Sequence, residues 1–326
     1  MQSKQLYYGI VGSGHIGNYH AQQINNISNV SLRGVYDISS LQAKKVANRY
    51  NTSVFQSLED TLSQCNAITI ATPADTHFDI AMEALKNNCH VFIEKPITTN
   101  LKDADDIIAL AKQKQLLVQV GHIERFNPAI VQLLKKEGIY SSLFIESERL
   151  TPFNSRGLDV DVILDLMIHD IDLILNIKQC SVIKIEAVGI KVLSQTFDLA
   201  SARIVFQDGC VANLKASRIS DAAVRKLRLF NTNKYWSVNL QNPGINTYGV
   251  QKQQPNEKNK KLIFSSDNKH IIHKQENIAP QNALYEELVS FITSIQSEKQ
   301  TLVDAGAGRD AIELALLIQE KINEST

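Results

Sequence analysis

Short apolar runs alternate with segments of helical periodicity over residues 6–121. The apolar runs lack polar alternation, which is typical of strands covered on both faces; they lie at residues 6–11, 32–36, 67–71, 90–93 and 116–120. Helical segments separate them, at residues 16–25, 41–50, 76–86 and 101–114. This succession predicts an α/β domain with a doubly wound parallel sheet.

The pattern changes after Gly121. Helices are expected at residues 128–136 and 162–177, with a strand near 143–150 between them. Residues 182–240 alternate in the manner of strands, with Asp208-Gly209 as a hairpin turn. Helices at 281–296 and 305–323 close the chain. We therefore predict a second, α+β domain with a mostly antiparallel sheet, and divide the chain into residues 1–121 and 122–326.

The composition limits the partners of the chain. Lys plus Arg and Asp plus Glu both number 34 among 326 residues, so no long-range field attracts nucleic acid or an anionic membrane. The polar segment 251–261 has no interleaved aromatic residues, which favours a solvated loop over a nucleic-acid patch. No apolar stretch is long enough to span a membrane, and the four cysteines lack metal-site spacing. We expect a soluble, cytoplasmic protein without a nucleic-acid or membrane partner.

Three glycines, Gly12, Gly14 and Gly17, form a G-x-G-x-x-G pattern between the first predicted strand and helix. In that context the pattern is the fingerprint of a Rossmann dinucleotide site. The first glycine permits a tight turn, the second lets the backbone approach a pyrophosphate, and the third lets the helix pack on the strand. The N–H groups of the first helical turn, at His15 and Ile16, would receive the negative charge.

Asp37 ends the second predicted strand, about 20 residues after the glycines. An acid at this point accepts hydrogen bonds from the adenosine ribose. Its carboxylate would repel a 2′-phosphate and no Arg follows it, so NAD is favoured over NADP. The alternative is a helix N-cap or turn residue.

Two polar segments follow the next predicted strands, Thr72-Pro73 in ATPADTH and Glu94-Lys95 in FIEKPIT. Open α/β sheets bind ligands at these strand ends. Burial and a cationic nicotinamide would lower the pKa of Lys95 and suit it to exchange a proton, with Glu94 to orient it. The alternatives are turn and cap residues in the first segment and a surface ion pair in the second.

The sequence DLMIHDID places Asp165, His169 and Asp172 on one helix face, at i, i+4 and i+7. Hydride transfer from a carbinol needs a proton acceptor and a donor to steady the alkoxide, and Lys95 and His169 supply that pair. Asp165 would orient the imidazole or contact a substrate hydroxyl. A metal site on this face is the less favoured alternative, and Asp170 is expected to be a solvated helix charge.

These motifs, in this order over nearly the whole chain, resemble the Gfo/Idh/MocA oxidoreductases. The resemblance implies a Rossmann domain followed by an α+β substrate domain, whose large open, mostly antiparallel sheet forms homodimer or homotetramer contacts. It also implies NAD(P)-dependent oxidation or reduction of a sugar or cyclitol. By position it implies the catalytic pair Lys95 and His169, the substrate-side carboxylate Asp165, and Thr72, Pro73, His77 and Glu94 along the cofactor.

The segments GHIERFNPA, LMIHDID and RKLRLF are similar to the branch of this family that contains UDP-N-acetylglucosamine 3-dehydrogenases, whereas the Gly-Gly pair common before the catalytic Asp is missing. A nucleotide-sugar substrate needs cations for its diphosphate. We expect substrate contacts from Arg125, Arg149, Arg156 and Asp172, with structural ion pairs as the alternative for the arginines.

The leading hypothesis is an NAD-dependent enzyme that oxidises the 3-hydroxyl of a UDP-N-acetylhexosamine to a 3-keto sugar. A second hypothesis keeps the chemistry but takes a free sugar, inositol or a dihydrodiol as substrate. A third is a non-catalytic NAD-binding sensor or scaffold, against which the presence of both Lys95 and His169 argues.

Overall fold

The computed structural model describes residues 5–154, 160–252, 260–266 and 269–324, and the chain forms two compact units. The first unit comprises Met1–Ile123 and Asn282–Glu313, and the second comprises Glu124–Gln281 and Leu314–Thr326. The sequence-based division assigned everything after residue 121 to the second domain. In the structure, residues 282–313 return to the first unit.

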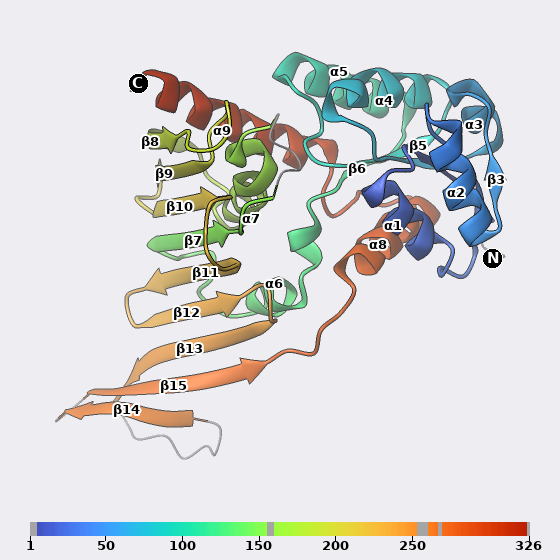
Figure 1. Ribbon diagram of the computed structural model, residues 1–326. Helices are drawn as coiled ribbons and strands as arrows, with labels where there is room; N and C mark the ends of the chain where they lie inside the picture. Colours follow the sequence, from blue (N-terminus) through green and yellow to red (C-terminus); the bar gives the residue numbers. More distant parts are fainter. Residues whose placement is uncertain (1–4, 155–159, 253–259, 267–268, 325–326) are drawn as a thin grey trace. The chain divides into compact units, whose positions relative to one another are not determined.

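The first unit contains a six-stranded parallel sheet in the order β3-β2-β1-β4-β5-β6 (Figure 1). The strands are β1 (Leu6–Val11), β2 (Val30–Tyr36), β3 (Ser53–Val54), β4 (Ala67–Ile70), β5 (His90–Ile93) and β6 (Val118–Val120). The strand order reverses between β1 and β4, which is the point where doubly wound sheets bind ligands. The predicted parallel sheet is confirmed, and β3 adds a short edge strand.

Helices α1, α2 and α8 cover part of the hydrophobic core of this sheet. The α8 residue Phe291 contacts the rings of Tyr8 in β1 and Phe92 in β5 edge-on, with centroid distances of 6.5 and 5.9 Å. The helical elements of the unit are α1 (His15–Ile24), α2 (Ser40–Tyr50), α3 (Leu58–Gln64), η1 (Ala74–Thr76), α4 (His77–Lys86), α5 (Leu101–Lys114), α8 (Ala283–Ser297) and the first part of α9 (Ala305–Glu324).

The second unit is built on a nine-stranded sheet in the order β14-β15-β13-β12-β11-β7-β10-β9-β8 (Figure 1). All pairings are antiparallel except that of β7 with β10, which confirms the predicted mostly antiparallel sheet. The strands are β7 (Phe144–Leu150), β8 (Val182–Ile190), β9 (Leu199–Phe206), β10 (Val211–Ser217), β11 (Val224–Asn231), β12 (Lys234–Asn239), β13 (Gly244–Gln251), β14 (Lys260–Ser266) and β15 (Lys269–Asn277).

The β9–β10 hairpin turns at Asp208-Gly209, as the sequence predicts. Gly209 has φ +81°, a left-handed conformation that glycine adopts without steric cost. The helical elements of this unit are η2 (Ile123–Phe126), which begins in the first unit, α6 (Pro128–Leu133), the π-helix η3 (Ile163–Met167), α7 (Ile168–Ile177) and the end of α9. In α9, Ile322 lies so close to Gly189 of β8 that a Cβ at Gly189 would be 2.9 Å from it.

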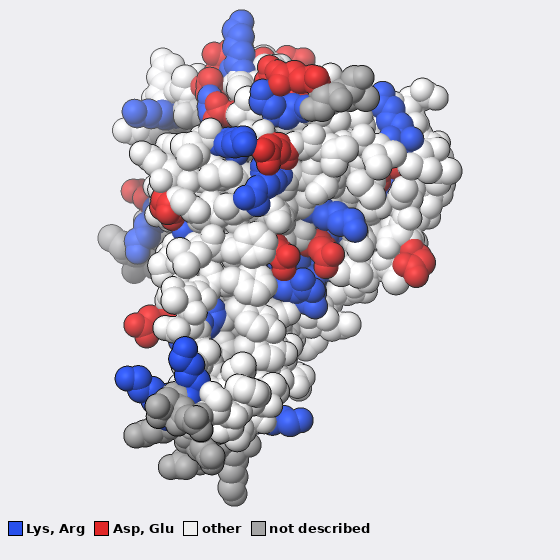
Figure 2. All heavy atoms as spheres, turned by 90° about the vertical axis from the view of Figure 1, so that its left-hand side faces the viewer, with Lys and Arg blue, Asp and Glu red and all other residues white. Residues whose placement is uncertain are grey.

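One face of the nine-stranded sheet carries a row of neighbouring aromatic rings that are only partly buried. Neighbouring ring centroids in the row lie 4.3–5.6 Å apart, and the row runs across five strands through Phe144, Phe230, Tyr235, Tyr248 and His273. On the face drawn in Figure 2, positive and negative side chains are interspersed and separated by uncharged areas. Among the described residues, no helix is long and apolar enough to cross a membrane.

Candidate active-site residues

The glycine-rich loop lies between β1 and α1, and each of its three glycines meets a different constraint. Gly12 has φ +87°, and a Cβ there would lie 2.5 Å from the carbonyl oxygen of Ala71. A Cβ at Gly17 would lie 1.8 Å from the Gly12 carbonyl oxygen, so α1 packs on the loop only because residue 17 is glycine. Gly14 faces open space. The loop therefore fits the turn, approach and packing roles that a dinucleotide site requires.

The first turn of α1 is exposed at its N-terminus, where Gly14 is the N-cap and provides no side chain. His15 and Ile16 are exposed beside it. Backbone N–H groups at such a helix start lack intrahelical partners and carry a partial positive charge. They suit a phosphate, so the chain's own residues fit a bound NAD pyrophosphate.

Asp37 connects the end of β2 to the glycine-rich loop. Its Oδ2 accepts hydrogen bonds from the Ser13 N–H at 2.7 Å and the Ser13 hydroxyl at 3.0 Å, and its Oδ1 accepts one from the Ser39 N–H at 2.8 Å. The bond from the Ser39 N–H is a turn interaction, which the sequence analysis gave as the alternative role of Asp37. Because each carboxylate oxygen accepts two hydrogen bonds, Oδ1 keeps capacity for a ribose hydroxyl.

Glu94 and Lys95 follow β5 directly, and both are half-buried. Glu94 Oε1 lies 2.7 Å from Nε2 of His20. Burial alone would raise the pKa of Glu94, but the hydrogen bond from His20 and the charges of His20 and Lys95 outweigh it and hold the pKa below its ordinary value. A Cβ at Gly121 would lie 2.9 Å from Glu94 Oε2, so the carboxylate is enclosed on that side as well. Glu94 is therefore an ionised carboxylate fixed beside Lys95.

His20 is a residue that the sequence analysis did not single out. Its ring has no exposed surface and makes an edge-on contact with Phe92 at 5.0 Å between centroids. It lies on the buried face of α1 with Gly17, Ala21 and Ile24. In the sequence, the sign of its role was a histidine among the small and apolar residues at positions 17, 21 and 24 of this helix face.

His77 bridges the segments that follow β4 and β5. Its Nδ1 lies 2.8 Å from the carbonyl oxygen of Pro96, and its Nε2 lies 2.9 Å from that of Thr72. Burial lowers the pKa of His77, against the effect of these two backbone contacts. That His77 lines the cofactor stays a prediction, and both of its ring nitrogens face backbone carbonyls. The ring holds the Thr72 and Pro96 segments together, whereas Thr72 is half-buried and Pro73 is exposed.

Asp165 and His169 lie in the second unit, where the π-helix η3 continues into α7. Asp165 is inside the π-helix and His169 is in the first turn of α7, and both are half-buried. π-Helical turns are uncommon and occur frequently at functional sites. The structure describes these two residues in one unit and Lys95 in the other, so each unit holds one part of the predicted catalytic set.

Asp172 does not share the environment of Asp165 and His169, although the sequence placed it on their face. Its side chain is 1% exposed and accepts two hydrogen bonds from Arg125, at 2.6 and 2.8 Å. This bidentate geometry is the strong form of an Arg–carboxylate pair. For Arg125 and Asp172, the expected substrate contact is therefore replaced by a buried ion pair.

Arg149 is also in a structural ion pair. Its guanidinium donates to Asp170 at 2.8 and 3.0 Å and to Glu124 at 2.8 Å, and all three side chains are buried. Burial alone would lower the pKa of Arg149, but the charges of Asp170 and Glu124 raise it. Asp170 is thus a buried counter-ion and the expectation of a solvated charge is wrong. Arg156, the third predicted phosphate ligand, lies outside the described residues.

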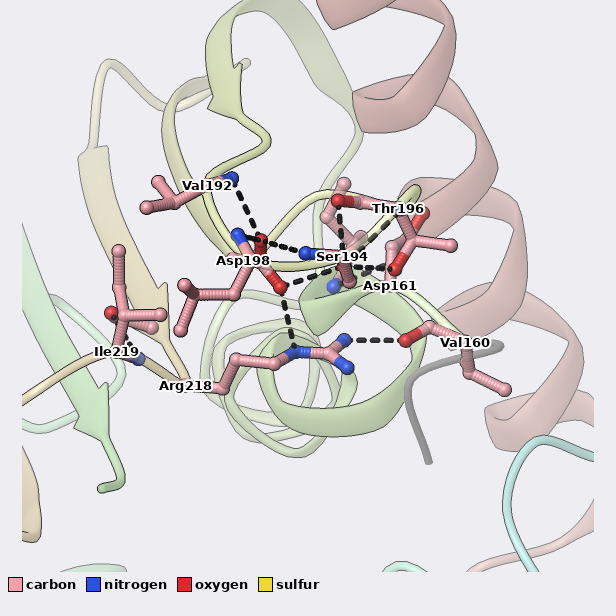
Figure 3. A network of polar contacts seen from close by, with 11 residues as sticks. Val160, Asp161, Val192, Ser194, Thr196, Asp198, Arg218 and Ile219 are labelled. Atoms are coloured by element: carbon pink, nitrogen blue, oxygen red, sulfur yellow. Dashed lines mark hydrogen bonds and ion pairs between the residues drawn. The ribbon is translucent and has the colours of Figure 1, made fainter. Parts of the chain in front are cut away.

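A second polar network holds the chain just before the π-helix (Figure 3). Asp198 has no exposed surface, and its Oδ2 accepts hydrogen bonds from the successive N–H groups of residues 192–194 at 2.7–3.0 Å. Arg218 approaches the same carboxylate at 3.7 Å and donates to the carbonyl oxygen of Val160. Asp161 Oδ1 then accepts from the Ile163 N–H at the start of the π-helix, at 3.0 Å. The segment that carries Asp165 is therefore fixed by partly buried polar contacts.

Within the described parts of the chain, no group of three or more His, Cys, Asp or Glu side chains is arranged to hold a metal ion. The face with Asp165 and His169 therefore has no third ligand among these residues.

Comparison with known proteins assigns the chain to a protein family. The model of the Gfo/Idh/MocA family, described as an oxidoreductase family with an NAD-binding Rossmann fold, matches residues 6–122. The UDP-N-acetylglucosamine 3-dehydrogenase of Acidithiobacillus ferrooxidans is 34% identical over 315 residues, which cover 95% of each chain. A solved structure of that enzyme superposes with a TM-score of 0.89 at 33% identity, over 97% of each chain.

More distant relatives act on cyclitols. The NAD-dependent scyllo-inositol 2-dehydrogenase of Bacillus subtilis is 25% identical over 66% of this chain and 68% of its own. The scyllo-inositol dehydrogenase of Lactobacillus casei, solved with NAD(H) and scyllo-inositol, has a TM-score of 0.79 at 21% identity, over 99% of this chain and 98% of its own, and shares the fold.

Proposed function

Because the chain belongs to the Gfo/Idh/MocA family of oxidoreductases, we propose that it oxidises the 3-hydroxyl of a UDP-N-acetylhexosamine to a 3-keto sugar, with NAD as the acceptor. The observation that carries this proposal is the similarity to the A. ferrooxidans enzyme along nearly the full length of both chains, including the second unit. The cyclitol relatives are less similar.

The proposed roles of the catalytic residues follow from the chemistry of a carbinol. Bound NAD supplies the hydride acceptor. Lys95 accepts the hydroxyl proton, and His169 donates a hydrogen bond to the oxygen as negative charge develops on it. Asp165 orients the imidazole or contacts a neighbouring hydroxyl of the sugar. Glu94, ionised beside Lys95, compensates the charge of the lysine.

The proposed cofactor site uses the strand ends of the first unit. The loop at Gly12, Gly14 and Gly17, with the N–H groups of His15 and Ile16, holds the pyrophosphate, and Asp37 binds the adenosine ribose. Thr72, Pro73 and Glu94 line the nicotinamide side. His77 contributes by holding the Thr72 segment against that of Pro96.

We also propose a homodimer or homotetramer in the cytoplasm. The row of partly buried rings across the nine-stranded sheet offers a flat aromatic surface for a second copy of the chain, because aromatic side chains are enriched at interfaces. The cysteines are free thiols, which suits a reducing compartment. Light scattering at several protein concentrations measures the assembly.

The test of the activity is an NADH-formation assay with UDP-N-acetylglucosamine, UDP-N-acetylgalactosamine, scyllo-inositol and glucose. We expect turnover with a UDP-sugar, and Lys95→Ala should lower kcat by about 10²–10⁴-fold. Lys102→Ala, which removes an exposed lysine from α5, is the matched control and should leave the rate unchanged. Turnover of scyllo-inositol in place of the UDP-sugars would support the second substrate hypothesis, and full activity of Lys95→Ala would refute the mechanism.

A further inference from the structure

Four side chains form a line of polar contacts through the core of the first unit. The Tyr8 hydroxyl lies 2.9 Å from Thr69 Oγ1, which lies 3.4 Å from His20 Nδ1, and His20 Nε2 lies 2.7 Å from Glu94 Oε1. Tyr8, Thr69 and His20 have no exposed surface. The line therefore starts at a buried phenol in β1 and ends at the carboxylate next to Lys95.

The donor and acceptor roles along this line follow from its two ends. Ionised Glu94 only accepts, so the hydrogen of the His20 ring is on Nε2. At the other end, burial raises the pKa of Tyr8, so the phenol keeps its proton. Either hydroxyl of the Tyr8–Thr69 pair can be the donor, and the line is continuous when Tyr8 donates to Thr69 Oγ1. The Thr69 hydroxyl is then left to donate to the lone pair of His20 Nδ1, over the longer distance of 3.4 Å.

Every polar hydrogen of the line has an acceptor in this arrangement. The hydroxyl pair thus gives His20 Nδ1 a hydrogen-bond partner and leaves Nε2–H directed at Glu94.

We propose that His20, held in its Nε2–H form by the hydroxyls of Tyr8 and Thr69, is a positioning residue that fixes the Glu94 carboxylate beside Lys95. This inference rests on the proposed function of Lys95 as the proton acceptor. The edge-on contact of the His20 ring with Phe92 holds the plane of the ring, and the hydroxyl pair supports the Nε2–H that faces Glu94 by occupying Nδ1. His20 acts through Glu94 and does not itself touch the substrate.

The test compares Thr69→Val, which removes the hydroxyl with little change in shape, with Thr69→Ser, which keeps it. We expect Thr69→Val to lower kcat by about tenfold or more while the KM for NAD changes less than twofold, because a small misplacement of a catalytic group is costly. Thr69→Ser should restore most of the rate. Tyr8→Phe, which keeps the packing of the ring, should give a smaller loss of the same kind.

The matched control is Thr61→Val. Thr61 is equally buried, and its hydroxyl donates to the Ser57 carbonyl oxygen at 2.9 Å, at the start of α3. This variant loses one buried hydroxyl bond without touching His20, so it should lower stability and leave kcat unchanged. Equal losses of kcat in Thr61→Val and Thr69→Val would overturn the positioning role.

The imidazole ¹⁵N chemical shifts of His20, assigned by comparison with His20→Gln, report the form of the ring without any turnover. We expect shifts of a ring with its hydrogen on Nε2 in the wild type and in Thr69→Ser, and altered shifts in Thr69→Val. A wild-type ring whose only hydrogen is on Nδ1 would overturn the inference. If no sugar is turned over, the proposed function fails, and the ¹⁵N spectrum still decides the form of His20.

Discussion

The two units hold their candidate catalytic residues by different means. In the first unit, Glu94 and the segments next to it are held by two histidines and by backbone carbonyl groups. In the second unit, α7 is held by ion pairs of buried side chains, Arg125 with Asp172 and Arg149 with Asp170 and Glu124. The supports differ in kind: contacts that fix the orientation of one carboxylate and its neighbouring segments in the first unit, and compensated buried charge beside a helix in the second.

The largest expected effect tests the ion pairs of the second unit. Arg149→Met leaves Asp170 and Glu124 buried without their cation and should lower the free energy of unfolding by about 3–5 kcal/mol. Trp236, the chain's single tryptophan, is buried in the second unit. Its fluorescence during urea unfolding therefore follows the unit in question.

The control for this variant is on the neighbouring strand. Arg228 pairs with Glu146 at 3.1 Å, and both side chains are about one-third exposed, at 32% and 34%. Arg228→Met should therefore cost less than about 1 kcal/mol. If the two variants were equally destabilised, buried charge would not be what distinguishes the support of α7.

The next prediction distinguishes the roles of two glycines of the first unit. Gly17→Ala places a methyl group against the Gly12 carbonyl and should destabilise the protein by about 1–3 kcal/mol. Gly14→Ala meets open space and should change stability by less than about 0.5 kcal/mol. Its methyl group would instead occupy the approach of the pyrophosphate, so we expect at least about tenfold weaker NAD binding. Calorimetry measures both quantities, and unchanged NAD affinity in Gly14→Ala would contradict its role.

A smaller effect concerns the choice of cofactor. Asp37→Asn keeps an oxygen that accepts from Ser13 but removes the charge that repels a 2′-phosphate. We expect the preference for NAD over NADP, measured as a ratio of kcat/KM, to fall about tenfold, equivalent to ~1.4 kcal/mol. Asp79→Asn, an exposed acid in α4, is the control. An unchanged ratio in Asp37→Asn would refute its ribose role.

The smallest effect depends on pH. The lowered pKa of Glu94 means that its ionised form stabilises the folded state above the ordinary value of 4.5, and that this stabilisation is lost as the pH falls below it. Glu94→Gln should be less stable than the wild type by about 1 kcal/mol at pH 7. The difference should shrink below pH 4.5 in calorimetric melting. The control Glu83→Gln changes an exposed residue of α4 and should be as stable as the wild type at every pH. If the difference in stability between Glu94→Gln and the wild type grew as the pH fell, the pKa of Glu94 would not be lowered.

Much of the fold was predictable because its elements have strong local patterns. The runs of β1 and β5 have the predicted bounds, as does α5. In contrast, α3 was missed. Its sequence LEDTLSQ buries only Thr61 and Leu62, and a Ser57 cap defines its start, so the apolar stripe is too short to recognise.

The site was predictable where backbone geometry demands a particular residue. The glycine loop is such a case, since its constraints act within a few positions of each other. The two ion pairs of α7 join residues 47 and 21 positions apart, the Arg149–Glu124 pair beside them joins residues 25 apart, and no spacing rule connects any of them. A lone arginine in a sequence looks the same whether it binds a phosphate or a buried carboxylate, so the sequence leaves both roles open for Arg125 and Arg149.

The return of residues 282–313 to the first unit has a consequence for protein synthesis. The core of that unit includes Leu288, Phe291 and Ile292 from α8. The ribosome synthesises the chain from its N-terminus. Residues 124–281 are therefore translated before the α8 side chains that complete the core of the first unit. Until α8 has been synthesised, the apolar surface around Tyr8 and Phe92 lacks the cover that Phe291 provides. A gene truncated after residue 123 would encode the nucleotide loop without the helix that completes its core.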